Sequence, residues 1–261
     1  MKSIPILSLA CFLILPNSFS VAQAPQEPQR LPDGGTREVL ISILIPSLPN
    51  APFTATVNTE WIRQLPDGST ITLKNHRAIA RDAAGRIFQE RRALVPDDGK
   101  TKSGVTQIEI SDPVAHELYI CMPHGRTCQL EEFSLRESLP YAAPGKAHTA
   151  QGSSSESEDL GKQSIGGLET VGTRQTTVIP ARTIGNDSPI LSKREFWYSP
   201  QLGVNLISKL QHPLSGTQNF EVSDIALGEP DPKLFEVPSG FKILDLRKPP
   251  EISSPSASSP N

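Results

Sequence analysis

The sequence predicts a mainly β protein, built as a curved antiparallel sheet or a half-open β-barrel of about ten strands with little helix. Three observations support this fold class. Residues 53–65 alternate between apolar and polar side chains, many later runs are strand-like and bounded by Gly, Pro, Asn or Asp, and no long run has the apolar period of an amphipathic helix. One sheet running through both halves of the chain is the favoured architecture, and two small packed sheets are the alternative.

The first clear strand is "FTATVNTEWIRQL", from Phe53 to Leu65. Successive side chains of a strand point to opposite faces, so every second residue shares a face. One predicted face carries Phe53, Ala55, Val57, Thr59, Trp61 and Leu65, with Arg63 as its only charge. This alternation is typical of a half-buried antiparallel strand.

The runs that follow continue the pattern on both sides of residue 150. "REVLISILIP" precedes the first strand and is expected to be a strand or a short helix. The remaining expected strands are "TITLKNHRAIARD", "RIFQERRALV", "VTQIEISDPV", "IGGLETVGTRQTTVIP", "PILSKREFWYS", "GVNLISKLQHP", "TQNFEVSDIAL" and "FKILDL". "DPKLF" is expected to form a single helical turn.

Composition divides the chain into segments. Residues 1–24 are expected to be a signal peptide, and the Pro- and Gly-rich residues 25–36 a mobile lead-in. Residues 37–248 are expected to form a single β domain. Within it, the small and polar residues 139–161 predict a long loop, and residues 249–261 predict a disordered tail.

The N-terminus predicts export. Lys2 supplies a positive charge, residues 4–15 are mostly apolar, and residues 22–24 read Ala-Gln-Ala, a sequence that signal peptidase accepts. A lipoprotein signal at Cys11 is the alternative, but Ser8 stands where such a signal has a branched aliphatic residue. The expected location is therefore periplasmic or secreted, with no transmembrane segment after signal removal.

The charge of the chain argues against nucleic acid or an anionic membrane surface as the main partner. The formal net charge is −3, and loss of Lys2 with the signal peptide changes it to −4. Proteins whose main partner is polyanionic usually carry a strong excess of lysine and arginine.

Cys121 and Cys128 are predicted to form a disulfide. The strand-like runs "HELYICMP" and "TCQLEEFS" flank the turn residues "PHGR", and facing cysteines on such a hairpin lie within bridging distance. A metal site with His116 and His124, or a redox pair, are the other interpretations. The six-residue gap between the cysteines fits neither a zinc pair nor a Cys-x-x-Cys motif.

Familiar catalytic motifs are missing from the sequence. There is no Gly-x-Ser-x-Gly, no His-Glu-x-x-His and no phosphate-binding glycine loop, and no cofactor or metal site is expected. "GNDSP" offers Asp187 and Ser188, and a hydrolase built on them with a distant histidine such as His212 is an alternative function. A turn between two strands is the more ordinary interpretation of this segment.

An arginine-rich run and an aromatic run are two further candidate sites. The arginines of "RDAAGRIFQERR", residues 81–92, could form an anion site, but a solvent-facing strand pair with ion pairs across it is favoured. "REFWYSP" places Phe196 and Trp197 on opposite faces of one strand, which indicates a central strand. The residues proposed as a possible apolar ligand or partner surface are Trp61, Phe88, Phe196 and Trp197.

The last third of the chain resembles a group of uncharacterised secreted bacterial β-proteins. The resemblance lies in "WYSPQL" and in the closing "PDPKLFEVP", residues 230–238, and the series from Trp61 to Arg92 fits the same group. The closing segment is also similar to that of periplasmic lipoprotein-carrier and sorting proteins. That resemblance implies a half-open β-barrel around an apolar cavity. The uncharacterised group implies no established activity.

The sequence therefore favours an exported non-enzymatic β-protein of the cell envelope. Its expected partner is an apolar ligand, such as a lipid, or another envelope protein. Besides the hydrolase, an envelope structural protein is the other alternative. The resemblance and the missing motifs name neither the ligand nor the partner.

Signal cleavage gives the first testable prediction. Intact mass measurement of the exported protein should show a chain that begins at Pro25, because residues 22–24 precede it as a cleavage site. A lipid-modified Cys11 at the mature N-terminus would contradict this prediction.

Overall fold

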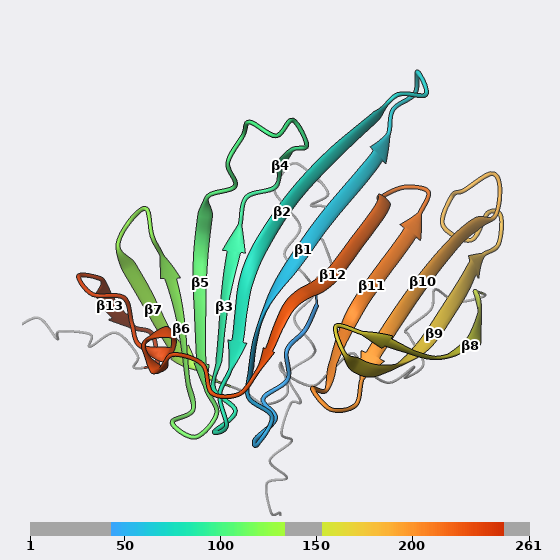
Figure 1. Cartoon of the computed structure of the whole chain (residues 1–261). Helices are drawn as coiled ribbons and strands as arrows, with labels where there is room; N and C mark the ends of the chain where they lie inside the picture. The colour runs from blue at the N-terminus through green and yellow to red at the C-terminus, as the bar shows by residue number, and fades with distance from the viewer. Residues whose placement is uncertain (1–42, 134–152, 248–261) are drawn as a thin grey trace, which may run out of the picture. The chain divides into compact units, whose positions relative to one another are not determined.

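The computed structural model describes residues 43–133 and 153–247. The chain divides into two units, Met1–Val39 and Leu40–Asn261, and all described residues belong to the second. Its elements are β1 (Phe53–Gln64), β2 (Thr70–Arg81), β3 (Ile87–Arg92), β4 (Val95–Pro96), β5 (Val105–Asp112), β6 (Glu117–Met122), β7 (Thr127–Glu132), β8 (Ser154–Ile165), β9 (Leu168–Ile179), β10 (Ile190–Ser199), β11 (Val204–His212), β12 (Gly216–Leu227), the 3₁₀ turn η1 (Pro232–Phe235) and β13 (Lys242–Asp245) (Figure 1).

The strands form one open sheet, as Figure 1 shows. Its order is β13-β7-β6-β5-β3-β2-β1-β12-β11-β10-β9-β8, with β4 paired to β2. All pairings are antiparallel except β13 with β7. The predicted mainly β fold and the single sheet are confirmed, with 13 strands in the described ranges in place of about ten. Helical structure there is limited to η1, at the predicted "DPKLF".

The expected loop over residues 139–161 is wrong from residue 154 onward, where β8 begins. β8 is an edge strand, so it pairs only with β9, and most of its side chains are exposed on both faces. A strand with no buried face needs no apolar alternation, which is why its sequence resembles a loop. Residues 139–152 lie outside the described part, as do residues 1–42 and 249–261 with the segments predicted there.

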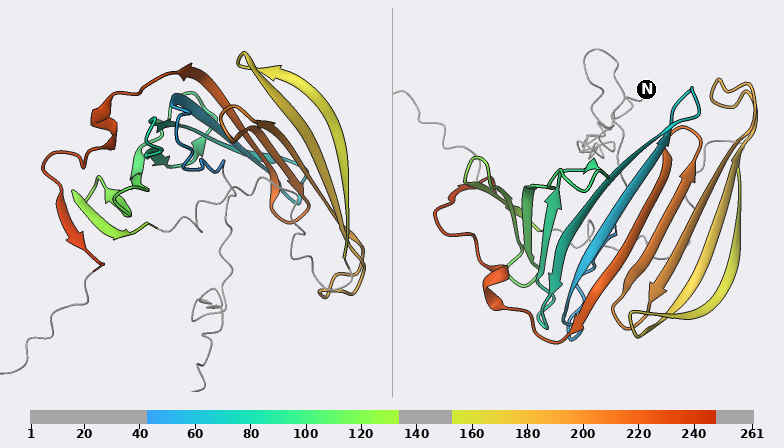
Figure 2. Two further views of the ribbon diagram at one scale, coloured as in Figure 1. Left: turned by 90° about the horizontal axis from the view of Figure 1, so that it is seen from below. Right: turned by 45° about the horizontal axis from the view of Figure 1, so that its top comes forward.

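The alternation of β1 defines two faces of the sheet. Phe53, Ala55 and Val57 are buried, as the sequence predicted, on a face that we call the inner face. This face is covered by residues 43–51, a segment without regular structure that we call the strap. The sheet curves across its strands, and the strap lies within the curve (Figure 2).

The main core lies between the strap and the inner face. Ile43 and Ile45 of the strap pack in one cluster with side chains from β1, β2, β3, β11 and β12. The buried members of this cluster are Ile43, Ile45, Phe53, Ala55, Val57, Ile79, Ile87, Leu168, Leu202, Val204, Leu206, Phe220 and Val222. "REVLISILIP" thus ends in a core segment, and its described residues form neither a strand nor a helix.

The opposite, outer face has a smaller core. Ala80, Phe88 and Ile110 lie side by side on β2, β3 and β5, and Phe235 of η1 packs against them. The Arg86 guanidinium lies over the Phe235 ring, 4.9 Å from its centroid. Both faces are therefore closed near the end of the sheet where β1 begins.

The cysteine hairpin is confirmed. Cys121 on β6 and Cys128 on β7 are direct cross-strand partners, both fully buried, and they form a disulfide. Their Cα atoms are 3.9 Å apart, closer than the roughly 4.4–6.8 Å typical of disulfides. The separation is also shorter than the roughly 4.5 Å between opposed Cα atoms in the closer kind of antiparallel pair.

Arg81 corrects the expectation that the arginines of residues 81–92 all face solvent. Its partner across the ladder is Phe53, so it lies on the inner face, and its side chain is fully buried. The guanidinium donates to the carbonyls of Ala51, Pro46 and Leu202 at 2.7–3.0 Å and stacks on the Phe53 ring. Of the other arginines, Arg91 forms the expected ion pair across strands, with Glu109 on β5. Arg86 pairs locally with Asp82 at the turn before β3, and Arg92 pairs with Glu90 on the same strand.

Burial lowers the pKa of Arg81 to about 10, so its guanidinium remains charged at neutral pH. The charge is stabilised by backbone carbonyls from two parts of the strap and from the turn between β10 and β11. Arg81 therefore joins the strap both to β2 and to the turn between β10 and β11.

We expect Arg81→Met to lower the free energy of unfolding by roughly 3 kcal/mol or more, because it leaves three buried carbonyls without a donor. Arg81→Lys should fall between Arg81→Met and the wild type, since it keeps the charge and loses the fork of donors. Urea unfolding measures both effects. Arg182→Met on an exposed turn is the control, with an expected change under about 0.5 kcal/mol. Equal stability of Arg81→Met and the control would contradict this role.

Candidate ligand-binding face

Cross-strand register extends the inner face of β1 to four neighbouring strands. Trp61 pairs with Leu73 on β2 and with Gln218 on β12, and Gln218 pairs with Leu210 on β11. One row further along the strands, Thr59 pairs with Phe220, Phe220 with Ser208, and Ser208 with Phe196 on β10. Residues directly opposite each other share a face, so these side chains all belong to the inner face.

Four large side chains of these rows form what we call the inner patch: Trp61, Leu73, Leu210 and Phe196. All four are half-buried, whereas Phe220 and Thr59 between them are buried. The patch lies beyond the strap contacts, toward the end of the sheet where β1 and β11 finish. Apolar and aromatic side chains that are half-buried in a row are suited to contact a further apolar group.

The Trp61 side chain has a fixed orientation. Its indole Nε1 donates to the Ser215 carbonyl oxygen at 2.7 Å, and the Arg63 guanidinium lies 5.2 Å from its ring centroid. The Arg63 guanidinium covers one face of the ring, and the Trp61 side chain as a whole is half-buried. A ring held in this way loses little conformational entropy when something packs against it.

Gln218 places a polar group in the middle of the inner patch. It lies between Trp61 and Leu210 in register, is 1% exposed, and its Oε1 has no hydrogen-bond partner. A buried amide oxygen without a donor costs about 1–3 kcal/mol. Because the side chain is 1% exposed, this oxygen lies beneath the surface of the patch and is not presented to a ligand.

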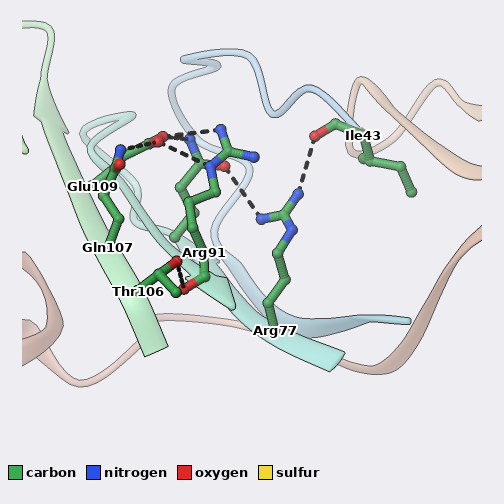
Figure 3. Close-up of polar contacts among 7 residues, drawn as sticks. Ile43, Arg77, Arg91, Thr106, Gln107 and Glu109 are labelled. Carbon is green, nitrogen blue, oxygen red and sulfur yellow. Dashed lines mark hydrogen bonds and ion pairs between the residues drawn. The ribbon is translucent and has the colours of Figure 1, made fainter. Parts of the chain in front are cut away.

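A polar cluster borders the inner patch on the β2, β3 and β5 side. Arg91 pairs with Glu109 through two hydrogen bonds, and Gln107 donates to the same carboxylate (Figure 3). Arg77 donates to the Ile43 carbonyl of the strap, and burial followed by the charge of Arg91 lowers its pKa to about 10. Register places Arg77, Arg91 and Glu109 on the inner face, which is thus apolar on one side and charged on the other.

The four aromatic residues proposed from the sequence do not form one surface. Trp61 and Phe196 belong to the inner patch, while Phe88 is buried in the outer core against Phe235. Trp197 lies on the outer face of β10, where it covers Gly172 and donates to Glu195. That hydrogen bond, together with one from Arg174, lowers the pKa of Glu195.

Leu73, Leu210 and Gln218 were missed in the sequence. Each lies in a strand that was predicted, but its neighbours across the sheet depend on the pairing of β1 with β12, which are more than 150 residues apart. The strict alternation of β1 could have assigned a face, but only the register identifies which partners share it.

The outer face contains a groove of about 790 Å³ beneath the turn at residues 95–103. Its charged side chains neutralise one another. Lys74 pairs with Asp97 at 2.8 Å and Glu60 at 3.2 Å, which raise its pKa, and Arg92 pairs with Glu90. Three of its charged lining residues, Lys74, Glu60 and Asp97, are thus already engaged with one another.

Asp187 and Ser188 lie on the exposed turn between β9 and β10, as the turn interpretation predicted. Asn186 organises this turn through side-chain bonds to the Pro180 and Ser188 carbonyls and the Ile184 amide. His212 accepts from the Leu214 amide, and no side-chain hydrogen bond joins the described residues Asp187, Ser188 and His212 to one another. Over residues 43–133 and 153–247, no cluster of three His, Cys, Asp or Glu side chains could hold a metal ion, and no helix is long and apolar enough to cross a membrane.

No family model matches this chain. No curated protein matches it either. The chain is distantly similar in structure to a chain of the MucA/MucB complex of Pseudomonas aeruginosa, with a TM-score of 0.40 and 14% identity over 75% of this chain. It spans 58% of the length of that matched chain.

Two further solved structures are similar in fold. A LolA superfamily protein from Nitrosomonas europaea has a TM-score of 0.30 and 14% identity, over 72% of this chain and 91% of its own. The lipoprotein LppX from Mycobacterium tuberculosis has a TM-score of 0.27 and 12% identity, over 73% and 90%. The expected resemblance to lipoprotein-carrier proteins is thus confirmed as a distant structural similarity.

Proposed function

We propose that this chain is an exported, non-enzymatic protein of the cell envelope that binds an apolar or amphipathic ligand on the inner face of its sheet. The observation that supports this proposal most directly is the inner patch, where Trp61, Leu73, Leu210 and Phe196 are half-buried in adjoining rows. In this proposal the mature chain begins at Pro25 and the described sheet is its binding domain.

The arrangement of the inner face favours an amphipathic ligand with an apolar chain. The inner patch can contact the apolar chain, and the charged cluster around Arg77 and Glu109 borders the patch at one side. A lipid or an acylated chain combines these features.

Preorganisation supports the same proposal. The strap and Arg81 hold the inner face at one end, and the bond from Trp61 to Ser215 orients the largest ring of the patch. A site whose side chains are already oriented binds without a further ordering cost.

The test compares two half-buried residues of β11 that point to opposite faces. Leu210→Asp places a carboxylate in the inner patch, while Ile207→Asp, which pairs with Trp197, places one on the outer face. We expect displacement of a fluorescent fatty acid to be weakened at least roughly tenfold by Leu210→Asp, because an unpaired carboxylate in an apolar contact is costly. Ile207→Asp should change it by less than about twofold.

Mass spectrometry of organic extracts should also find lipid with the wild-type protein and much less with Leu210→Asp. Circular dichroism of both variants checks that they fold. Equal effects of the two substitutions, or absence of any bound or displaceable apolar ligand, would contradict the proposal and favour a structural role in the envelope.

A further inference from the structure

Three hairpin turns lie at the end of the sheet opposite the strap. They join β1 to β2 at residues 65–69, β9 to β10 at residues 180–189, and β11 to β12 at residues 213–215. The pairings of Gln64 with Thr70 and of His212 with Gly216 place these turns at one end of neighbouring strands. We call this end of the sheet the tip end; it is at the top of Figure 1.

The tip end exposes large apolar side chains from all three hairpins. Leu214 is 68% exposed and Leu191 45% exposed. The exposed apolar residues here are Leu65, Ile71, Ile184, Leu191 and Leu214. A single exposed leucine needs no explanation, but five such side chains on adjoining turns of one end of a sheet indicate a contact surface.

A hollow of about 460 Å³ connects these hairpins. Leu191, Pro213 and Leu214 contribute apolar surface to it, and Arg63, Lys193 and His212 contribute nitrogen donors. No carboxylate lines the hollow, and Lys193 forms no ion pair within the described part of the chain. Its chemistry therefore suits an anionic group attached to apolar chains.

The charge of the tip end differs from that of the whole chain. The described segments 62–71, 180–194 and 210–217 contain four cations, Arg63, Arg182, Lys193 and Arg194, against two carboxylates, Asp67 and Asp187. The neighbouring turn at residues 97–102 has two lysines and two aspartates and adds no net charge. A locally basic end on a chain of net charge −3 can face an anionic surface that the chain as a whole would not attract.

We propose that the tip end docks on an anionic lipid bilayer, with the apolar side chains of the three hairpins among the lipids and Lys193 at the phosphate level. Exposed leucine and isoleucine on adjoining turns, with basic side chains behind them, match the layered polarity of a membrane interface. The occupant is a bilayer because the apolar residues are spread over three separate turns, which a planar surface can contact together.

Vesicle co-sedimentation with the full mature chain tests this proposal. We expect binding to vesicles of equal parts phosphatidylglycerol and phosphatidylcholine at about 0.1 M salt, and loss of most of it at about 1 M salt or with phosphatidylcholine alone. Leu191→Asp and Leu214→Asp should each weaken binding roughly tenfold, since each removes an inserted leucine. Val114→Asp is the matched control, because Val114 is 75% exposed on the turn between β5 and β6 at the other end, and should leave binding unchanged.

Lys193→Gln tests the contribution of charge and should weaken vesicle binding about fivefold. Lys233→Gln in η1 is the control and should leave vesicle binding unchanged. Leu210→Asp should still bind vesicles, which separates docking from ligand binding on the inner face. No binding to anionic vesicles, or equal losses in the tip-end and control variants, would overturn the proposal. Binding through Leu191 and Leu214 to a protein partner and not to vesicles would also overturn it.

Discussion

The guanidinium of Arg81 joins three parts of the chain that lie far apart in the sequence. It donates to Pro46 and Ala51 in the strap and to Leu202 in the turn after β10, and it does so from a fully buried position on β2. A buried charge without a carboxylate partner is costly unless its donors are satisfied. Here each donor direction has a carbonyl, so the charge dictates where the strap crosses the inner face.

The closed end of the sheet follows from this anchor. The strap covers the inner face over Phe53 and Val57, and η1 covers the outer face over Phe88. Farther along β1, the same alternation continues to Trp61, whose side chain is only half-buried. The inner patch is therefore the part of the inner face that the strap does not cover. It is apolar because the alternation of the core strands continues into it.

Much of this arrangement could be predicted from the sequence where a pattern is local. The alternation of β1, the cysteine hairpin, the turn at "GNDSP" and the interior position of β10 all depend on residues close together in the chain. Arg81 could not be predicted as a buried anchor, because arginine on a strand usually faces solvent and its acceptors are distant carbonyls. β8 could not be predicted, because an edge strand that is exposed on both faces has the composition of a loop.

The inner patch shows the same limit. Trp61 and Phe196 were recognised as large aromatic residues, but their shared face depends on two intervening strands, β12 and β11. Trp197, adjacent in sequence to Phe196, lies on the other face. Local composition thus identified the aromatic residues, but only the pairing of distant strands shows which of them lie side by side on one face.

The two tryptophans of the chain lie on opposite faces of the sheet, Trp61 inside and Trp197 outside, so each reports on one face. The most direct test of ligand binding to the inner face is fluorescence quenching by a soluble brominated fatty acid in the variants Trp197→Phe and Trp61→Phe. Ligand binding on the inner face predicts saturable quenching of Trp61 in Trp197→Phe, beyond that caused by the unbrominated acid. It predicts little quenching of Trp197 in Trp61→Phe. Equal or stronger quenching of Trp197 would contradict it.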